Sequence, residues 1–202
     1  IFSDSKNSRA QEIGDKNGIP VVIRDINDFY SSRGKNKRDF IKNPELDAGT
    51  RESFDSLTIS DLKKYDVDVV ALAGYMSAVS KPFIKTFLSI NVHPADLSVI
   101  ESNRRKYAGL NVVRDAILNN EKFLYSTVHI VREKIDYGEI LMRSKGLPVK
   151  INVSIEELKK DKELLESTVT SHQNKLKEIG DWIIFPLVLE MISQKRYQID
   201  SN

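Results

Sequence analysis

The segment Ser89-Ile90-Asn91-Val92-His93-Pro94 carries the strongest indication of fold and chemistry in this chain. It is a short apolar run, typical of a β-strand, that ends in an amide, an imidazole and a proline. In open α/β sheets the reacting groups gather at the carboxyl ends of the strands. We therefore expect Asn91 and His93, at the end of this strand, to face a reactive crevice.

A second imidazole and a carboxylate follow downstream. His129 lies in the apolar run 126–131, and Asp136 opens the turn-like stretch 136–140. Taken singly, an asparagine at a strand end, a His-Pro pair and an Asp-x-Gly turn are ordinary structural features. Together, an amide, an imidazole and a carboxylate can polarise an acyl group, move a proton and orient the group that moves it. Two strand ends meeting at one crevice would bring Asn91, His93 and Asp136 together.

The fold class follows from the order of the elements. Residues 1–4 are typical of a strand end, residues 7–17 of a helix closed by Gly18, and residues 19–23 of a second strand, which makes a βαβ unit. The Val-rich run 67–73 is typical of a buried strand in a parallel sheet. These patterns predict an α/β fold with a mainly parallel twisted sheet flanked by helices, a Rossmann-type arrangement.

The remaining elements alternate in the same way. Helices are expected over 81–87 and 109–118, and strands over 88–92, 122–132 and 139–149. Residues 31–56 interrupt the pattern and are interpreted as an exposed loop. Its basic run 31–38 could bind phosphate, but a solvated loop is the preferred interpretation. A capping box at Ser154 predicts the start of a helix. We expect residues 150–202 to be the helical C-terminal part of a single domain that spans 1–202.

Composition narrows the classes of function. The net charge is +2 over 202 residues, so bulk charge predicts no nucleic-acid partner. The chain has no cysteine and three histidines, which excludes disulfides and thiol nucleophiles and predicts no metal site. No apolar run approaches the ~20 residues that span a bilayer, so no membrane partner is expected, and a cytoplasmic location suits the lack of cysteine.

Four blocks of sequence resemble those of the folate-dependent formyltransferase family. They are Ala73-Gly74-Tyr75-Met76-Ser77, the Asn-x-His-Pro-x-x-Leu block 90–97, Thr127-Val128-His129, and the Asp-x-Gly-x-Ile block 136–140. The resemblance covers most of residues 1–150 and is greatest to the branch that formylates glycinamide ribonucleotide.

The resemblance implies roles for particular residues. It makes Asn91, His93 and Asp136 catalytic, and His129 a supporting residue on the substrate side or a structural one. Asp181 matches an acidic residue that contacts the amine substrate, although Trp182 replaces the histidine that follows it in the family. The residues implied to bind the folate are Leu72, Ala73, Gly74, Tyr75, Met76, Ile135 and Gly138.

The implied reaction is transfer of a formyl group from 10-formyltetrahydrofolate to a primary amine, with glycinamide ribonucleotide as acceptor in purine biosynthesis. The alternatives are hydrolysis of the same folate, formylation of a sugar nucleotide or of methionyl-tRNA, and a folate-binding module without catalysis. The partners expected are small molecules, with a homodimer as an open possibility and no metal.

The chain departs from the family pattern in three places. The family begins with a strand and a Gly-Ser-Asn phosphate loop, whereas Ile1 falls where the second strand should start, so we expect that segment to be missing from the sequence as given. The stretch 98–107 is longer than its family counterpart and contains Arg104, Arg105 and Lys106. These cations could bind phosphate or folate glutamates, but a solvated loop is the default interpretation. Ala108 replaces a family proline before Gly109.

Overall fold

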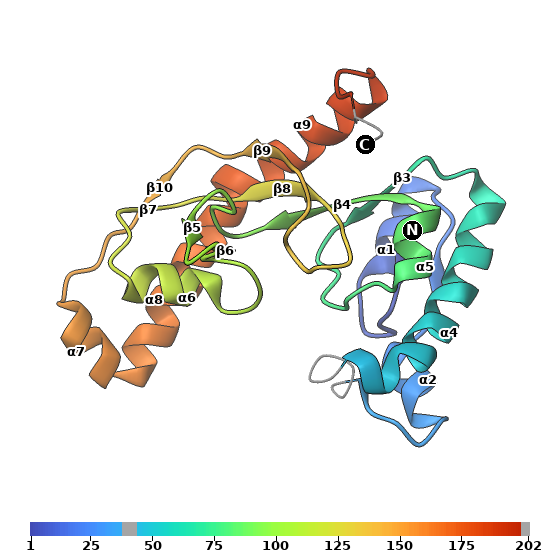
Figure 1. Ribbon diagram of the computed structural model, residues 1–202, viewed down its shortest axis with the longest axis horizontal. Helices are drawn as coiled ribbons and strands as arrows, with labels where there is room; N and C mark the ends of the chain where they lie inside the picture. Colours follow the sequence, from blue (N-terminus) through green and yellow to red (C-terminus); the bar gives the residue numbers. More distant parts are fainter. Residues whose placement is uncertain (38–43, 199–202) are drawn as a thin grey trace. The chain divides into compact units, whose positions relative to one another are not determined.

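The computed structural model describes residues 1–37 and 44–198. The chain divides into two compact units, Ile1–Ser89 and Ile90–Asn202, each of which is described by itself (Figure 1). The prediction of one domain over 1–202 stays a prediction.

The first unit opens with the expected βαβ arrangement. Strands β1 (Phe2–Ser3) and β2 (Val22–Ile23) pair in parallel, with α1 (Ala10–Asn17) between them in the chain. Gly18 ends α1 with φ of 64°, a left-handed conformation that glycine adopts without steric cost. The βαβ unit and its glycine cap are confirmed.

A loop was expected over 31–56, but the described residues of this range are largely helical, which corrects the prediction. Helix α2 (Ile26–Ser31) precedes it, α4 (Pro44–Leu62) covers its second half, and the 3₁₀ turn η1 (Lys63–Tyr65) follows. The helical pattern is hidden because α4 buries polar side chains. Arg51 and Asp55, one turn apart, are each 1% exposed and form an ion pair of 2.6 Å. Of the basic run, residue 38 lies outside the described residues.

The unit continues with β3 (Val69–Leu72) and α5 (Lys81–Thr86), and β4 (Leu88–His93) leads into the second unit. These elements lie where they were predicted. The side chains of β3 are half-buried apart from the exposed Ala71, so the full burial expected for this strand is not found. The apolar centre of the unit contains Ile26, Tyr30 and Phe54.

The second unit is built on three strands with antiparallel pairing. Strand β8 (Thr127–Ile130) pairs with β4 on one side and with β9 (Ile140–Arg143) on the other. Two small antiparallel pairs join β7 (Phe123–Leu124) to β10 (Leu147–Pro148) and β5 (Ile100–Glu101) to β6 (Arg104–Arg105). The run 122–132 is therefore two short strands, and every residue of β8 is buried.

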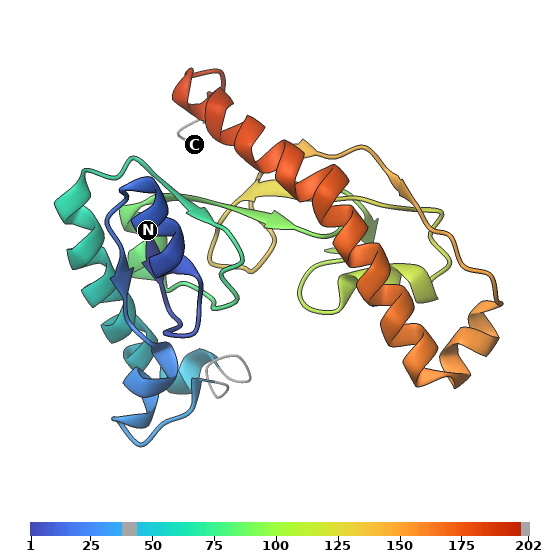
Figure 2. The same cartoon turned by 180° about the vertical axis from the view of Figure 1, so that it is seen from behind.

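Helices complete this unit. Helix α6 (Val112–Leu118) is followed after the strands by α7 (Ile155–Lys160), α8 (Lys162–Leu176), a π-helical turn η2 (Lys177–Asp181) and α9 (Trp182–Ser193). Figure 2 shows α8 and α9 as one long helical rod in front of the strands of this unit. The α/β class and the helical C-terminal part are confirmed. The apolar core lies between α6 and the helices after residue 154, and its fully buried members include Ile117, Leu158 and Leu176.

Within the described ranges, none of the helices combines the length and the apolar character needed to cross a membrane.

The capping box predicted at Ser154 is present. The Ser154 hydroxyl accepts a hydrogen bond from the Glu157 N–H at 3.2 Å, and the Ser154 N–H donates to the Glu157 carboxylate at 2.9 Å. We expect Ser154→Ala to lower the free energy of unfolding by about 1 kcal/mol, because the Glu157 N–H in the first turn of α7 loses the hydroxyl oxygen that accepts its hydrogen bond. Urea unfolding measures the loss. Ser167→Ala, inside α8, should change it by less than about 0.5 kcal/mol, and an equal loss in both variants would contradict the capping role.

Candidate active site

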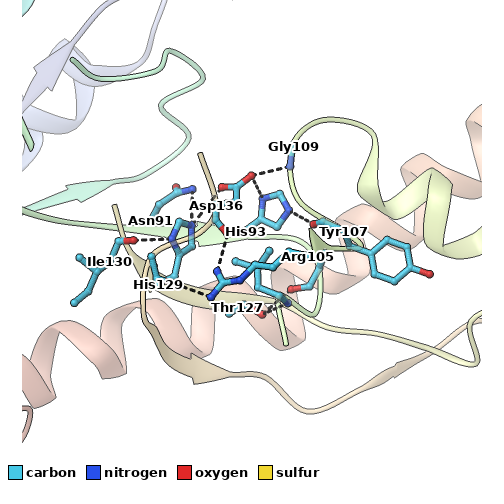
Figure 3. A network of polar contacts seen from close by, with 12 residues as sticks. Asn91, His93, Arg105, Tyr107, Gly109, Thr127, His129, Ile130 and Asp136 are labelled. Carbon is cyan, nitrogen blue, oxygen red and sulfur yellow. Dashed lines mark hydrogen bonds and ion pairs between the residues drawn. The ribbon is translucent and has the colours of Figure 1, made fainter. Parts of the chain in front are cut away.

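The pairing of β4 with β8 assembles the first part of the site. Asn91 and His93 are two residues apart on β4 and therefore share one face of the strand. His129 on β8 lies directly opposite Asn91 in the antiparallel register, and its Nε2 lies 3.5 Å from the Asn91 amide nitrogen. Two neighbouring strands thus place an amide and two imidazoles together (Figure 3).

Asp136 joins this group from the turn between β8 and β9. Its Oδ2 lies 3.5 Å from His93 Nδ1, and its Oδ1 lies 3.4 Å from His129 Nε2. The Gly109 N–H donates to Oδ2 at 2.8 Å. The carboxylate therefore stands between two imidazoles and is held by a backbone donor.

The assembly differs from the expected meeting of two parallel strand ends. Because β8 runs antiparallel to β4, the end of β8 at Ile130 lies opposite Ile90, early in β4. The turn that follows has to fold back for Asp136 to reach His93. Asp136 has φ of 57°, in the left-handed region that aspartate tolerates better than most residues.

Each histidine has its other ring nitrogen against a carbonyl oxygen. His93 Nε2 lies 2.8 Å from the Tyr107 carbonyl, and His129 Nδ1 lies 2.9 Å from the Ile130 carbonyl. A carbonyl only accepts, so these nitrogens carry the proton in the neutral rings. A proton gained by His93 would sit at Nδ1, beside the Asp136 carboxylate.

Burial and charge act against each other on these groups. His93, His129 and Asp136 are 6%, 2% and 7% exposed. Burial lowers the pKa of His93 below 6.5, while Asp136 opposes that shift by favouring the charged ring. Burial also raises the pKa of Asp136, but a hydrogen bond from His129, the charge of His93 and the Gly109 N–H outweigh it, so the net pKa is lowered. The carboxylate is therefore ionised at neutral pH.

The hydrogen bonds of Thr127 link the Thr-Val-His block to the Asn-x-His-Pro block. From β8, its hydroxyl donates to the Ala95 carbonyl at 2.6 Å and accepts from the Leu97 N–H at 3.3 Å. It thereby holds the chain just after His93-Pro94 against the neighbouring strand.

Asp181 lies near the same group, in the π-helical turn η2. Its pKa is raised, chiefly by burial, and Ser126 and Lys177 oppose the shift. Asp181 and His93 are near enough for each to affect the pKa of the other. Asp181 Oδ1 is buried and has no hydrogen-bond partner among the described residues. An amine or ammonium group is a partner of the kind this oxygen lacks.

The residues implied to bind the folate lie in two places. Leu72 ends β3, and Ala73, Gly74, Tyr75 and Met76 follow it in the first unit. The Tyr75 hydroxyl accepts a hydrogen bond from Arg51 at 2.9 Å, burial raises the Tyr75 pKa to about 12, and Met76 is 78% exposed.

Ile135 and Gly138 belong to the second unit, in the turn that carries Asp136. Ile135 is 59% exposed, whereas a Cβ placed on Gly138 would lie 1.7 Å from the Ile130 carbonyl oxygen. Gly138 therefore has a packing reason to be glycine. A role of all these residues in folate binding stays a prediction.

Sequence reasoning missed three contributors to the site. The Tyr107 carbonyl and the Gly109 N–H act through the backbone, where side-chain identity gives no signal. The solvated-loop interpretation of 98–107 is wrong for Arg105, which is half-buried and donates to the carbonyls of Asp136 and Gly138. The longer loop with its consecutive cations was the signal that could have found it. Only Arg104 of the three cations is exposed, and Lys106 pairs with Glu101.

Over residues 1–37 and 44–198, no three His, Cys, Asp or Glu side chains are grouped so that they could hold a metal ion.

Comparison with known proteins identifies the family. The family model described as formyl transferase matches residues 1–172. Phosphoribosylglycinamide formyltransferase of Haemophilus influenzae is 29% identical over 168 residues, which cover 82% of this chain and 65% of that protein. The enzyme of the same name from Escherichia coli is 27% identical over 155 residues, which cover 76% and 62%. The chain thus spans less than two thirds of these relatives.

Solved structures agree in fold. Glycinamide ribonucleotide transformylase 1 of Symbiobacterium toebii superposes with a TM-score of 0.65 at 23% identity, covering 100% of this chain and 76% of that one. Phosphoribosylglycinamide formyltransferase of Streptococcus pneumoniae gives 0.61 at 18% identity, covering 95% and 84%. The family predicted from the four sequence blocks is confirmed: the chain belongs to the formyl transferase family.

Proposed function

We propose that this protein transfers the formyl group of 10-formyltetrahydrofolate to a primary amine, with glycinamide ribonucleotide as the acceptor. Family membership and the names of the relatives support the reaction and its acceptor. The observation that carries the proposal is the close grouping of the half-buried Asn91 with the buried His93, His129 and Asp136 in the second unit.

The reaction exchanges one carbon–nitrogen bond for another. The acceptor amine attacks the formyl carbon, its new N–C bond forms, and the carbonyl oxygen becomes an oxyanion. When the tetrahedral intermediate collapses, the bond between carbon and the folate N10 breaks. One proton leaves the incoming nitrogen and one reaches N10, so no oxidant, reductant or covalent nucleophile is needed.

The described side chains match these demands. The Asn91 amide donates a hydrogen bond to the oxyanion. His93 receives or returns the proton, and the imidazolium that it forms is stabilised by the Tyr107 carbonyl on one side and by Asp136 on the other. His129 orients Asp136 from the opposite side. Asp181, whose Oδ1 lacks a partner, binds the acceptor amine.

For the folate we propose Leu72 to Met76, Ile135 and Gly138. The backbone after β3 is suited to contact with a flat ring, because Gly74 has φ of 66° and carries no side chain, and Tyr75 points its hydroxyl at Arg51.

A spectroscopic assay of 10-formyltetrahydrofolate conversion by the purified protein, with and without glycinamide ribonucleotide, tests the function. We expect conversion only with the nucleotide. Conversion without it would replace the proposal by hydrolysis. Folate binding without conversion in either case would overturn the acceptor; sugar nucleotides and methionyl-tRNA would then be assayed, and failure of all of them would indicate a binding module.

Replacing His93 by alanine should lower kcat by about 10²–10⁴-fold, because the group that moves the proton is lost. Steady-state kinetics measures the change, and circular dichroism checks that the variant is folded. Lys37→Ala, in the basic run of the first unit, serves as the control and should keep the wild-type rate. A larger loss in Lys37→Ala than in His93→Ala would show that the site is misplaced.

A further inference from the structure

The stretch 98–107 forms an ordered β-hairpin in the second unit. Strands β5 and β6 pair Ile100 with Arg105 and Glu101 with Arg104. The two residues between them, Ser102 and Asn103, have φ of 50° and 60°, as the tightest type of hairpin turn requires. The hairpin thus gives Arg105 a defined position.

Arg105 contacts three consecutive residues of the turn that carries Asp136. Its Nη1 donates to the Asp136 carbonyl at 2.6 Å and its Nη2 to the Gly138 carbonyl at 2.9 Å. Its backbone N–H donates to the Tyr137 hydroxyl at 3.0 Å, and its guanidinium carbon lies 5.6 Å from the centre of the Tyr137 ring. Figure 3 shows the guanidinium aimed at the backbone of this turn.

The contacts are made where the turn is most constrained. Asp136 has its left-handed φ of 57°, and the backbone at Gly138 lies directly against the Ile130 carbonyl. A planar guanidinium donates two N–H groups in fixed directions, so it can fix the separation of two carbonyl oxygens as well as satisfy them. Both bonds go to carbonyls, so the charge of Arg105 is not consumed in an ion pair with the Asp136 carboxylate.

We propose that Arg105 is a positioning residue for the formyl transfer proposed above: by holding residues 136–138, it keeps the Asp136 carboxylate between His93 and His129. The expected loss of turnover rests on the proposed function. The expected displacement of the Asp136 carboxylate rests on the geometry alone. The proposal also assigns a function to the hairpin, which brings Arg105 to this turn.

The test compares Arg105→Gln and Arg105→Lys with Arg104→Gln. Arg104 is the neighbouring cation on β6 and is exposed, so it is a matched control for charge and for the hairpin. We expect Arg105→Gln to lower kcat by about 10²-fold, because displacement of a catalytic group by about 1 Å has this cost, with both KM values nearly unchanged. Arg105→Lys should lose less, because its ammonium can still bind one of the carbonyls.

A measurement independent of activity accompanies the kinetics. The pKa of His93 is followed by histidine NMR in each variant, since Asp136 raises that pKa, Asp181 also raises it and His129 lowers it. In Arg105→Gln the His93 pKa should fall in the same direction as in Asp136→Asn, while Arg104→Gln leaves it unchanged. This readout applies even if the protein proves not to transfer formyl groups, so failure of the function and failure of the positioning role are distinguishable.

Three results would overturn the proposal. An unchanged His93 pKa in Arg105→Gln would show that Asp136 does not depend on Arg105. An equal effect of Arg104→Gln would show that only the charge of the hairpin matters. A rise in KM without loss of kcat would make Arg105 a substrate-binding cation. If Arg105→Gln does not fold, Arg105→Lys provides both readouts.

Discussion

Replacing Asp136 with asparagine is expected to lower turnover by about 10²–10⁴-fold while leaving the fold intact. The amide has nearly the same shape, and its oxygen can still accept the Gly109 N–H that now binds Oδ2. What disappears is the negative charge beside His93 Nδ1 and His129 Nε2. An imidazolium formed at His93 then lacks its stabilising partner.

The same substitution has a defined effect on titration. Burial already holds the His93 pKa below 6.5, and Asp136 is the largest influence that opposes this shift. Without the carboxylate the His93 pKa should fall further, so the protonated ring should be lost at a lower pH than in the wild type. NMR titration of the histidine rings measures the shift. Asp115→Asn, on the exposed side of α6, is the control. A wild-type rate in Asp136→Asn would contradict the proposed catalytic site.

Among substitutions of glycine by alanine in this chain, Gly138→Ala is expected to lower stability the most. The new Cβ would lie 1.7 Å from the Ile130 carbonyl oxygen and 2.7 Å from its carbon, which belong to the backbone of β8 and cannot rotate away. Either the strand or the turn must move. We expect a loss of free energy of unfolding of about 3 kcal/mol, at the upper end for overpacking, and a loss of turnover because Asp136 is two residues away.

Urea unfolding and the formyl-transfer assay check this expectation together. Gly49→Ala is the matched control: Gly49 lies in α4, no heavy atom lies within 4 Å of its added Cβ, and alanine favours helix by up to about 1 kcal/mol. It should leave stability equal or higher. A Gly138→Ala protein with the wild-type urea midpoint and turnover would show that the turn can relax freely and that its close packing is unimportant.

The sequence by itself predicted most of the helices and strands and a candidate chemistry. Glycine at the end of α1, the capping box at Ser154 and the short apolar runs are local signals, and local signals depend on backbone preferences that neighbouring residues set. Asn91, His93 and Asp136 were proposed as a catalytic group because their blocks resemble those of the formyltransferase family and because an amide, an imidazole and a carboxylate suit acyl transfer. Local preferences did not predict helix α4, because its residues Arg51 and Asp55 are polar and yet are buried as an ion pair.

Only the tertiary structure decided how these groups meet. The antiparallel register that sets Asn91 opposite His129 depends on strand pairing across 38 residues of chain. The Tyr107 carbonyl, the Gly109 N–H and the Arg105 guanidinium then fix the histidine and the carboxylate. Backbone donors and acceptors are common to nearly all residues, and an arginine in a loop is usually solvated. Their roles therefore arise from position in space, which no local pattern encodes.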